Sequence, residues 1–321
     1  MKKKMVLVLA VMLLFWAQGL GQGFAADKLR LGTGVKLIFR MDIVPLAAEE
    51  HGIWKRHGLD VDWRAFRGTT TMIKGMLAGS IDLGVGQAAT YLQALHRGVP
   101  LIAISDYYFA PDFAFYVRNT SRLRRPQDLK GTSISVTRLG GGTHAFGRIV
   151  ARKLGLEGQV QFISGGGGQA KVALVQAGKA DVVVTSPDRM VELVIKGQFR
   201  VLLKVADYLP KPWASTIVFA QRDFVKSKPD VTQRGVRAIL EANKFVLNNP
   251  DWAIAKWREV SRQSEEAARI LYKDIQRYLS RDGKLSPKGF ENVNRFLLDY
   301  KVVRKPRQLA IEKLYTDRFT K

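Results

Sequence analysis

Two segments about one hundred residues apart repeat the same order of apolar and polar positions. Residues 72–85 and residues 172–184 each begin with a short apolar run at helical spacing, which stops at an Ala-Gly pair. An aspartate and a run of aliphatic residues follow, as is typical of a strand. Gly79 and Gly178 can adopt the left-handed conformation that ends a helix. Because the repeat distance is far too long for a solenoid, the pattern predicts two similar lobes with a ligand held between them.

The other apolar runs predict strands that alternate with helices along most of the chain. In the first lobe we expect strands at 29–33, 59–66, 81–85 and 101–105, and helices at 42–51, from 69–71 onward, and at 88–97. In the second we expect strands at 133–137, 159–163, 180–185 and 200–205, and a helix at 143–154. A strand at 213–219 leads back to the first lobe, and helices follow at 230–247, 251–258, 264–279 and 287–300. This order is typical of an α/β fold whose sheets are mixed, mostly parallel and covered by helices.

The same order predicts how the chain is divided between the lobes. Residues 26–106 and 214–321, including the C-terminal helices, are expected to form a discontinuous first lobe. Residues 107–213 are expected to form the second. No low-complexity linker separates them, so two short crossings are expected to join the lobes beside a cleft.

The first 25 residues have the pattern of a cleavable export signal. Three lysines at positions 2–4 precede an uncharged apolar stretch at 5–17, and small residues stand near position 25. The alternative is an uncleaved membrane anchor, but a spanning helix needs about 20 apolar residues. We therefore expect an exported protein of the periplasm that loses residues 1–25.

Composition excludes several classes of chemistry. The chain has no cysteine, which removes disulfides, thiolate metal sites, cysteine nucleophiles and lipid attachment at a cysteine. Neither a metal site nor a cofactor is expected. The formal net charge is +24, from 52 basic and 28 acidic residues. Because the basic residues are scattered, with no run of five, this charge predicts a solvated surface and no nucleic-acid partner.

Candidate binding residues lie in the loops that follow the predicted strands. Ligands of parallel α/β sheets gather at the carboxyl ends of strands, where helix N-termini favour oxyanions. Neutral hydrogen-bonding groups there are Thr69, Gln87, Thr143, Ser164 and Ser186. Arginines that fit an anion are Arg40, Arg67, Arg138 and Arg189, His144 begins a helix, and Phe39 is a candidate apolar wall. The alternative for each residue is a structural role: a helix cap, a turn, a solvated charge or part of the core.

Two patterns resemble catalytic motifs but lack residues that those motifs require. Residues 165–171 are similar to a phosphate-binding loop, but Ala170 replaces its second glycine and Val172 its Ser or Thr. Ser186 and His144 have no Gly-x-Ser-x-Gly turn around the serine. The sequence therefore gives no support to phosphoryl transfer or serine hydrolysis.

Six short stretches together resemble the solute-binding proteins of ABC importers. They are residues 29–32, 45–54, 57–61, 77–82, 97–100 and 128–131. They look most like the branch that binds nitrate, sulfonates, taurine and thiamine-pyrimidine precursors. The resemblance implies a type II periplasmic binding fold, hinge closure on a small polar or anionic solute, and delivery to a membrane permease and its ATPase. It also implies a protein that works as a monomer.

By loop position, the resemblance implies which residues face the cleft. They are Phe39 and Arg40, Gly68 and Thr69, Gly86 and Gln87, Gly142 and Thr143, and Ser186. Pyrimidine synthases that share this fold use a cysteine-rich motif, which this chain lacks. We therefore expect a binding protein and no enzyme. An enzyme of the synthase type and a ligand-sensing module for a receptor are the alternatives.

Overall fold

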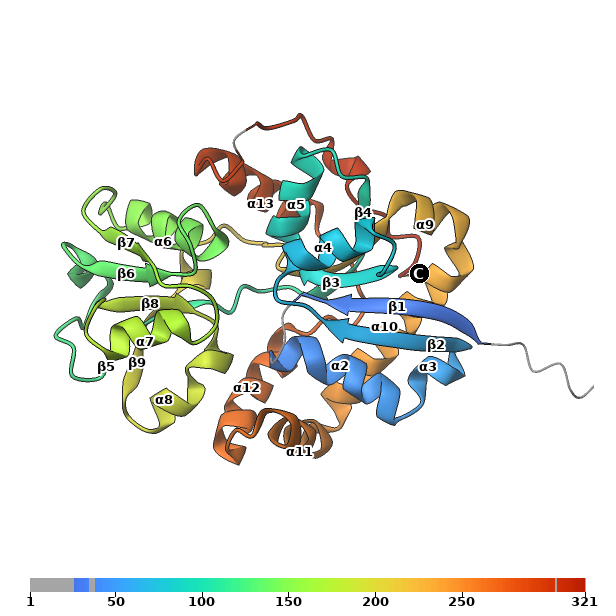
Figure 1. The fold of residues 1–321 in the computed structure, drawn as a ribbon, viewed down its shortest axis with the longest axis horizontal. Coiled ribbons are helices and arrows are strands. Elements are labelled where there is room, and N and C mark those ends of the chain that lie inside the picture. The colour runs from blue at the N-terminus through green and yellow to red at the C-terminus, as the bar shows by residue number, and fades with distance from the viewer. Residues whose placement is uncertain (1–25, 35–37, 304, 321) are drawn as a thin grey trace, which may run out of the picture.

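The computed structural model describes residues 26–34, 38–303 and 305–320, which form two α/β lobes side by side (Figure 1). The first lobe contains a five-stranded sheet in the order β2-β1-β3-β10-β4. Its strands are β1 (Asp27–Thr33), β2 (Leu59–Ala65), β3 (Leu83–Gln87), β4 (Leu101–Tyr108) and β10 (Thr216–Gln221). Strand β1 is parallel to β2 and β3, whereas β10 is antiparallel to both β3 and β4. The sheet is therefore mixed, as expected.

The second lobe contains another five-stranded sheet, in the order β7-β6-β8-β5-β9. Its strands are β5 (Ala114–Arg118), β6 (Ser133–Val136), β7 (Gln161–Ser164), β8 (Val182–Thr185) and β9 (Phe199–Lys204). Strand β6 is parallel to β7 and β8, and β5 is antiparallel to β8 and β9. The two sheets thus have the same arrangement: the fourth strand in each order, β10 or β5, follows a crossing between the lobes and is antiparallel to both of its neighbours.

Helices cover both faces of each sheet. The first half supplies α2 (Phe39–Glu50), α3 (Ile53–Arg56), α4 (Thr69–Leu77) and α5 (Ala88–His96), and the second lobe α6 (Gly142–Lys153), α7 (Ala170–Gln176) and α8 (Val191–Ile195). The C-terminal helices are α9 (Arg222–Ser227), α10 (Pro229–Asn248), α11 (Pro250–Ser261), α12 (Glu265–Tyr278) and α13 (Pro287–Asp299). Short 3-10 turns are η1 (Pro126–Leu129), η2 (Pro187–Arg189), η3 (Val205–Asp207) and η4 (Ile311–Lys313).

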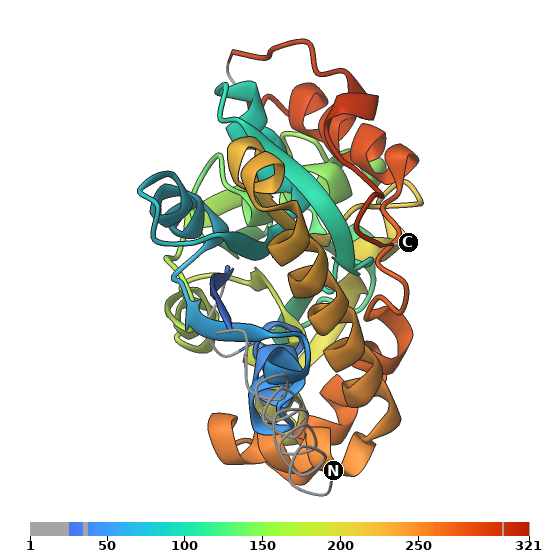
Figure 2. The ribbon, with the colours of Figure 1, turned by 90° about the vertical axis from the view of Figure 1, so that its right-hand side faces the viewer.

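The longest helix, α10, runs across the first lobe (Figure 2). Val236, Ile239 and Val246 recur at helical spacing and are buried, in one cluster with residues of α2 and β1. Helices α12 and α13 begin at Ser264 and Ser286, whose hydroxyls accept hydrogen bonds from the amides of the first turn. The apolar periodicity of the C-terminal segment therefore predicted helices α10 to α13 correctly.

The repeated unit is confirmed in both lobes. Helix α4 leads to β3 and helix α7 to β8, with Gly79 and Gly178 at φ of 72° and 70° between helix and strand. Strand β5 and the short helices α3, α8 and α9 were not predicted. The three helices have 4 to 6 residues, so the apolar period had little length over which to appear. Strand β5 has five residues, as does the predicted strand β3, so its length does not explain the omission.

Two chain segments cross between the lobes: residues 109–113 link β4 to β5, and residues 205–215 link β9 to β10. Helix α13 adds a contact, since Phe296 packs against Phe146 of α6 with ring centroids 5.9 Å apart. Among residues 26–320, apart from 35–37 and 304, no helix has the length and apolar character needed to cross a membrane. The expected signal at 1–25 lies outside the described residues.

Candidate ligand-binding cleft

A cavity of about 270 Å³ lies between the lobes and is lined by residues of both. It is lined by Ile38, Arg40, Arg67, Gln87, Phe113, Thr137, Arg138, Gly141, Gly142, Thr143, Phe146, Gly167, Gly168, Lys171, Thr185, Ser186 and Arg189. The strand ends place them there: Gln87 ends β3, Thr137 follows β6 and Ser186 follows β8. The cavity thus occupies the carboxyl ends of strands in both sheets, where α/β folds bind ligands.

The first turn of α6 forms one wall. Gly141 and Gly142 bring backbone to the cavity, and a Cβ at Gly142 would meet no heavy atom within 4 Å. The Thr143 hydroxyl is buried and accepts a hydrogen bond of 2.9 Å from the amide of Thr137. Thr143 therefore holds the loop against the helix, and the helix terminus presents its partial positive charge to the cavity.

Lys171 is the most informative side chain in the lining. It is 4% exposed, and its Nζ donates a hydrogen bond of 3.3 Å to the Thr137 hydroxyl. No carboxylate among the described residues lies within 4 Å of Nζ. Burial and the neighbouring positive charge of Arg189 lower the pKa of Lys171 to about 8. A buried ammonium without a counterion is costly, so a negative charge placed beside Lys171 would be stabilised.

The lining as a whole is cationic. Arg67, Arg138, Lys171 and Arg189 contribute positive charge, and no aspartate or glutamate is among the described lining residues. The Arg40 guanidinium is paired within the protein: it donates to Asp112, lies 3.7 Å from Asp188 Oδ2, and stacks over Tyr108. Burial raises the pKa of Asp112, and the positive charge of Arg40 opposes that rise.

Arg40 also belongs to a set of contacts that joins the lobes beside the cavity. The amide of Phe39 donates a 2.8 Å hydrogen bond to Asp188 Oδ1, and Gln263 Nε2 donates to the Asp188 carbonyl at 2.9 Å. Residues of α2 and of the segment before α12 thereby hold the η2 turn of the second lobe. The described conformation is one in which the lobes are in contact at one side of the cleft.

Six of the twelve residues expected to bind ligand line the cavity, whatever their role there. They are Arg40, Gln87, Arg138, Gly142, Thr143 and Ser186. Arg67 and Arg189, which the sequence also indicated, lie with them.

The other six expected residues lie outside the lining, and for three of them the reason is packing. The Phe39 ring is buried and stacks on Trp257 at 4.9 Å, because α2 turns that side chain into the core. Thr69 is buried beneath β3, where its hydroxyl accepts from the Gln87 amide. Gly86 faces Thr69, since a Cβ there would lie 2.6 Å from Thr69 Cγ2. Gly68 begins α4 with φ of 135° and is not in contact with the cavity.

His144 and Ser164 stabilise loops of the second lobe. His144 Nδ1 accepts a 2.8 Å hydrogen bond from the Gly140 amide, and its ring lies edge-on to Phe162. Ser164 is exposed and its hydroxyl reaches the Thr137 carbonyl at 3.5 Å. His144, in the first turn of α6, and Ser164, the last residue of β7, therefore contact loops of the second lobe and lie outside the cavity lining.

Lys171, Phe113 and Phe146 are lining residues that sequence reasoning missed. Lys171 is in a mostly apolar helix, three residues after a run of four glycines at 165–168. A lysine in the first turn of a helix, beside a loop that can approach a ligand, was the available signal. The two phenylalanines gave none, because any aromatic in this region is equally suited to the core.

Comparisons with known proteins give the family and the fold of this chain. The family described as NMT1/THI5 like matches residues 43–253. A Brucella abortus protein named as a binding protein is 24% identical over 300 residues, which is 89% of each chain. The periplasmic aliphatic sulphonate-binding protein SsuA of Escherichia coli superposes with a TM-score of 0.74 at 18% identity, over 88% of this chain and 94% of that one.

An enzyme has the same fold. The desulfurization enzyme DszB, solved as a cysteine-to-serine variant with biphenyl-2-sulfinic acid, has a TM-score of 0.68 at 16% identity, over 92% of this chain and 98% of that one. These structural likenesses show the type II periplasmic binding fold that the sequence predicted. Because the family model matches more than half of the sequence, the chain belongs to the NMT1/THI5-like family, whose member here has the periplasmic binding protein fold.

Proposed function

We propose that this chain captures a small organic anion in the cleft and delivers it to an ABC importer. The observation that carries the proposal is Lys171, a buried cation that lines the cavity and has no carboxylate partner in the part of the chain that the structure describes. An anion bound there would supply the missing countercharge. The Brucella relative named as a binding protein and the sulphonate-binding SsuA fold neighbour support the same class of function.

The geometry suggests how such an anion would be held. Its charged head would accept hydrogen bonds from Lys171 and Thr137, and the first turn of α6 would face it from the same lobe. Gln87 and Arg67 would reach it from the first lobe. Because only a closed form brings both sets together, the ligand would stabilise closure by contacts that an open form lacks.

The size of the cavity limits the solute. Ligand sites commonly measure about 300–1,000 Å³, and about 270 Å³ is below that range. Phe113 and Phe146 offer a limited apolar wall to a short carbon chain. These features favour a short-chain sulfonate, carboxylate or nitrate over a larger ring system, and within that set we favour a sulfonate.

We propose binding without catalysis. The DszB structure was solved as a variant of a cysteine, and this chain contains no cysteine anywhere. General acid–base catalysis needs a titratable group within reach of the substrate. Burial lowers the pKa of Lys171 to about 8, and we propose that this side chain pairs with the ligand's charge and transfers no proton. A pyrimidine-synthase-like enzyme and a receptor-linked sensor are the competing functions.

The remaining parts of the proposal concern the cell. We propose that residues 1–25 direct export to the periplasm, that the protein works as a monomer, and that a permease with its ATPase receives the solute. The division into lobes at 26–106 with 214–321 and at 107–213 stays a proposal. It is supported by the strands of each sheet, which fall on opposite sides of the two crossings.

A thermal-shift screen of the exported protein tests the proposal directly. The compounds are ethanesulfonate, taurine, nitrate, butyrate and an aminopyrimidine, each at several concentrations with matched ionic strength. We expect a concentration-dependent rise in Tm with one or more anions and none with the pyrimidine. A rise with the pyrimidine alone, or conversion of any compound during incubation, would overturn the anion-capture function.

A further inference from the structure

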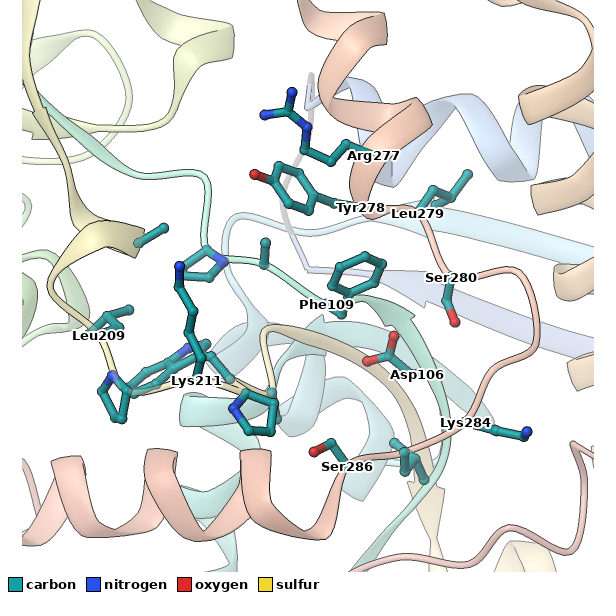
Figure 3. A pocket seen from close by; sticks show the side chains of 18 of the residues that line it. Asp106, Phe109, Leu209, Lys211, Arg277, Tyr278, Leu279, Ser280, Lys284 and Ser286 are labelled. Atoms are coloured by element: carbon teal, nitrogen blue, oxygen red, sulfur yellow. The ribbon is translucent and has the colours of Figure 1, made fainter.

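A second cavity, of about 660 Å³, shares no lining residue with the cleft. Its walls are the first crossing at 109–111, the second crossing at 206–214, and the segment 277–286 that joins α12 to α13. Figure 3 shows Leu209 and Lys211 of the second crossing opposite Tyr278 and Phe109. We call this cavity the hinge pocket, because both connections between the lobes line it.

One side of the hinge pocket is aromatic and apolar. Phe109 is 47% exposed, and its ring lies edge-on to Tyr278 with centroids 5.6 Å apart. Trp213, Leu209 and Leu285 add buried apolar surface. An exposed aromatic ring supported by a second ring forms a wall suited to a flat apolar group.

The charge of the hinge pocket is positive. Five basic residues line it, against three acidic ones: Lys204, Lys211, Arg277, Arg281 and Lys284 against Asp106, Asp207 and Asp282. Lys284 lies 3.8 Å from Asp282, but Lys204 and Lys211 have no carboxylate within 4 Å in the described part of the chain. Burial raises the pKa of Asp106 to about 7, so near neutral pH this carboxyl is partly protonated and opposes an anion only in part.

We propose that the hinge pocket binds an organic anion with an aromatic body, whose ring lies on Phe109 and Tyr278 and whose carboxylate faces Lys204 and Lys211. The volume of the hinge pocket is large enough for a two-ring carboxylate, whereas the smaller volume of the cleft is not. The two lysines are exposed, where a ligand can reach them. Lys204 also interacts electrostatically with Asp274 and opposes the rise in the pKa of that carboxyl that burial causes. This site is separate from the cleft and does not depend on the function proposed for it.

The test uses 1-naphthylacetate as the probe and isothermal titration calorimetry on the exported protein at pH 7. We expect saturable binding with one site per chain. Replacing both lysines, Lys204→Gln with Lys211→Gln, should weaken binding at least tenfold. Lys226→Gln, the same change at an exposed lysine of α9 outside the pocket, should leave it unchanged.

Two further arms separate the hinge pocket from other sources of binding. Lys171→Met alters the cleft alone and should bind the probe as wild type does, whatever the cleft binds. The neutral analogue 1-naphthaleneethanol should bind at least tenfold more weakly than the acid. Absence of saturable binding, loss of it in Lys171→Met, equal binding of the alcohol, or full binding by the doubly substituted chain with wild-type circular dichroism would each overturn the proposal.

Discussion

Replacing Lys171 with methionine should make the ligand-free protein more stable and a poorer binder at the same time. Methionine has a similar length and no charge, so it fills the buried position without an unpaired ammonium. The two effects have opposite signs because the same charge is costly in the empty cleft and favourable beside an anion. A residue with a purely structural role would not separate them in this way.

The pKa of Lys171 sets the size of the stability effect. A fall from the ordinary value of 10.5 to about 8 corresponds to about 3 kcal/mol against the charged form in the folded state. Below pH 8 lysine is protonated in both folded and unfolded chains, so the whole penalty is present. Between about pH 8 and pH 10.5 the unfolded chain binds more protons, so the stability of the wild type should rise with pH. Since methionine also loses the hydrogen bond to Thr137, we expect a net gain of about 1–3 kcal/mol at pH 7.

Binding should change in the other direction. A hydrogen bond to a charged group contributes about 1.5–3 kcal/mol, so the affinity for ethanesulfonate should fall between about tenfold and a hundredfold. The wild-type affinity should also decline above about pH 8, as Lys171 loses its proton, whereas that of the variant should stay level.

Urea unfolding at pH 7 measures the stability change, and calorimetric titration with ethanesulfonate measures the binding change. Lys179→Met is the matched control, because Lys179 is an exposed lysine in the turn after α7 and should affect neither quantity. A Lys171→Met chain that is no more stable than the wild type, and binds ethanesulfonate equally well, would refute the unpaired-cation argument.

Three other predictions concern the scaffold around the two cavities. Arg40→Met should lower the free energy of unfolding in urea by about 3–5 kcal/mol, because it leaves buried carboxylates without their cation. Adding Asp112→Asn should recover part of the loss. A loss below about 1 kcal/mol would contradict the interlobe ion pair. Asp106→Asn should flatten the pH dependence of the free energy of unfolding. Because burial raises the pKa of the wild-type carboxyl to about 7, Asp106 stabilises the fold at low pH, and up to about 4 kcal/mol of that stability is lost as the pH rises from about 4 to 7. An unchanged profile would show that Asp106 is ionised throughout. Gly86→Ala should lower the free energy of unfolding by about 1–3 kcal/mol, since the added Cβ would have a neighbouring carbon at 2.6 Å. Gly142→Ala, where the added Cβ faces open space, should stay within about 0.5 kcal/mol of the wild type. Equal effects of the two variants in thermal unfolding would contradict this packing.

Local sequence carried most of the information about the elements. Helix–glycine–strand units recurred at 72–85 and 172–184 because each is set by short-range preferences: apolar spacing, a residue at positive φ and an aliphatic run. The long C-terminal helices α10 to α13 followed from their apolar period for the same reason. Strand β5, a five-residue run directly after the first crossing, was not predicted, although the four-residue strands β6, β7 and β8 were.

The choice between ligand contact and core depended on tertiary structure. Phe39 and Arg40 are adjacent on α2, yet the helix turns the ring into the core and the guanidinium toward Asp112. Thr69 and Thr143 occupy equivalent strand-end helices, but the first lies under β3 and the second lines the cleft.

The sequence alone determined an α/β chain of two similar lobes, the loops that follow their strands, and a chain without cysteine chemistry. Those properties depend on neighbouring residues and on composition, which a single sequence displays. The tertiary structure decided which cations are neutralised: Arg40 by acids far along the chain, and Lys171 by none among the described residues. Charge compensation depends on residues brought together by folding, and no spacing along the chain records it.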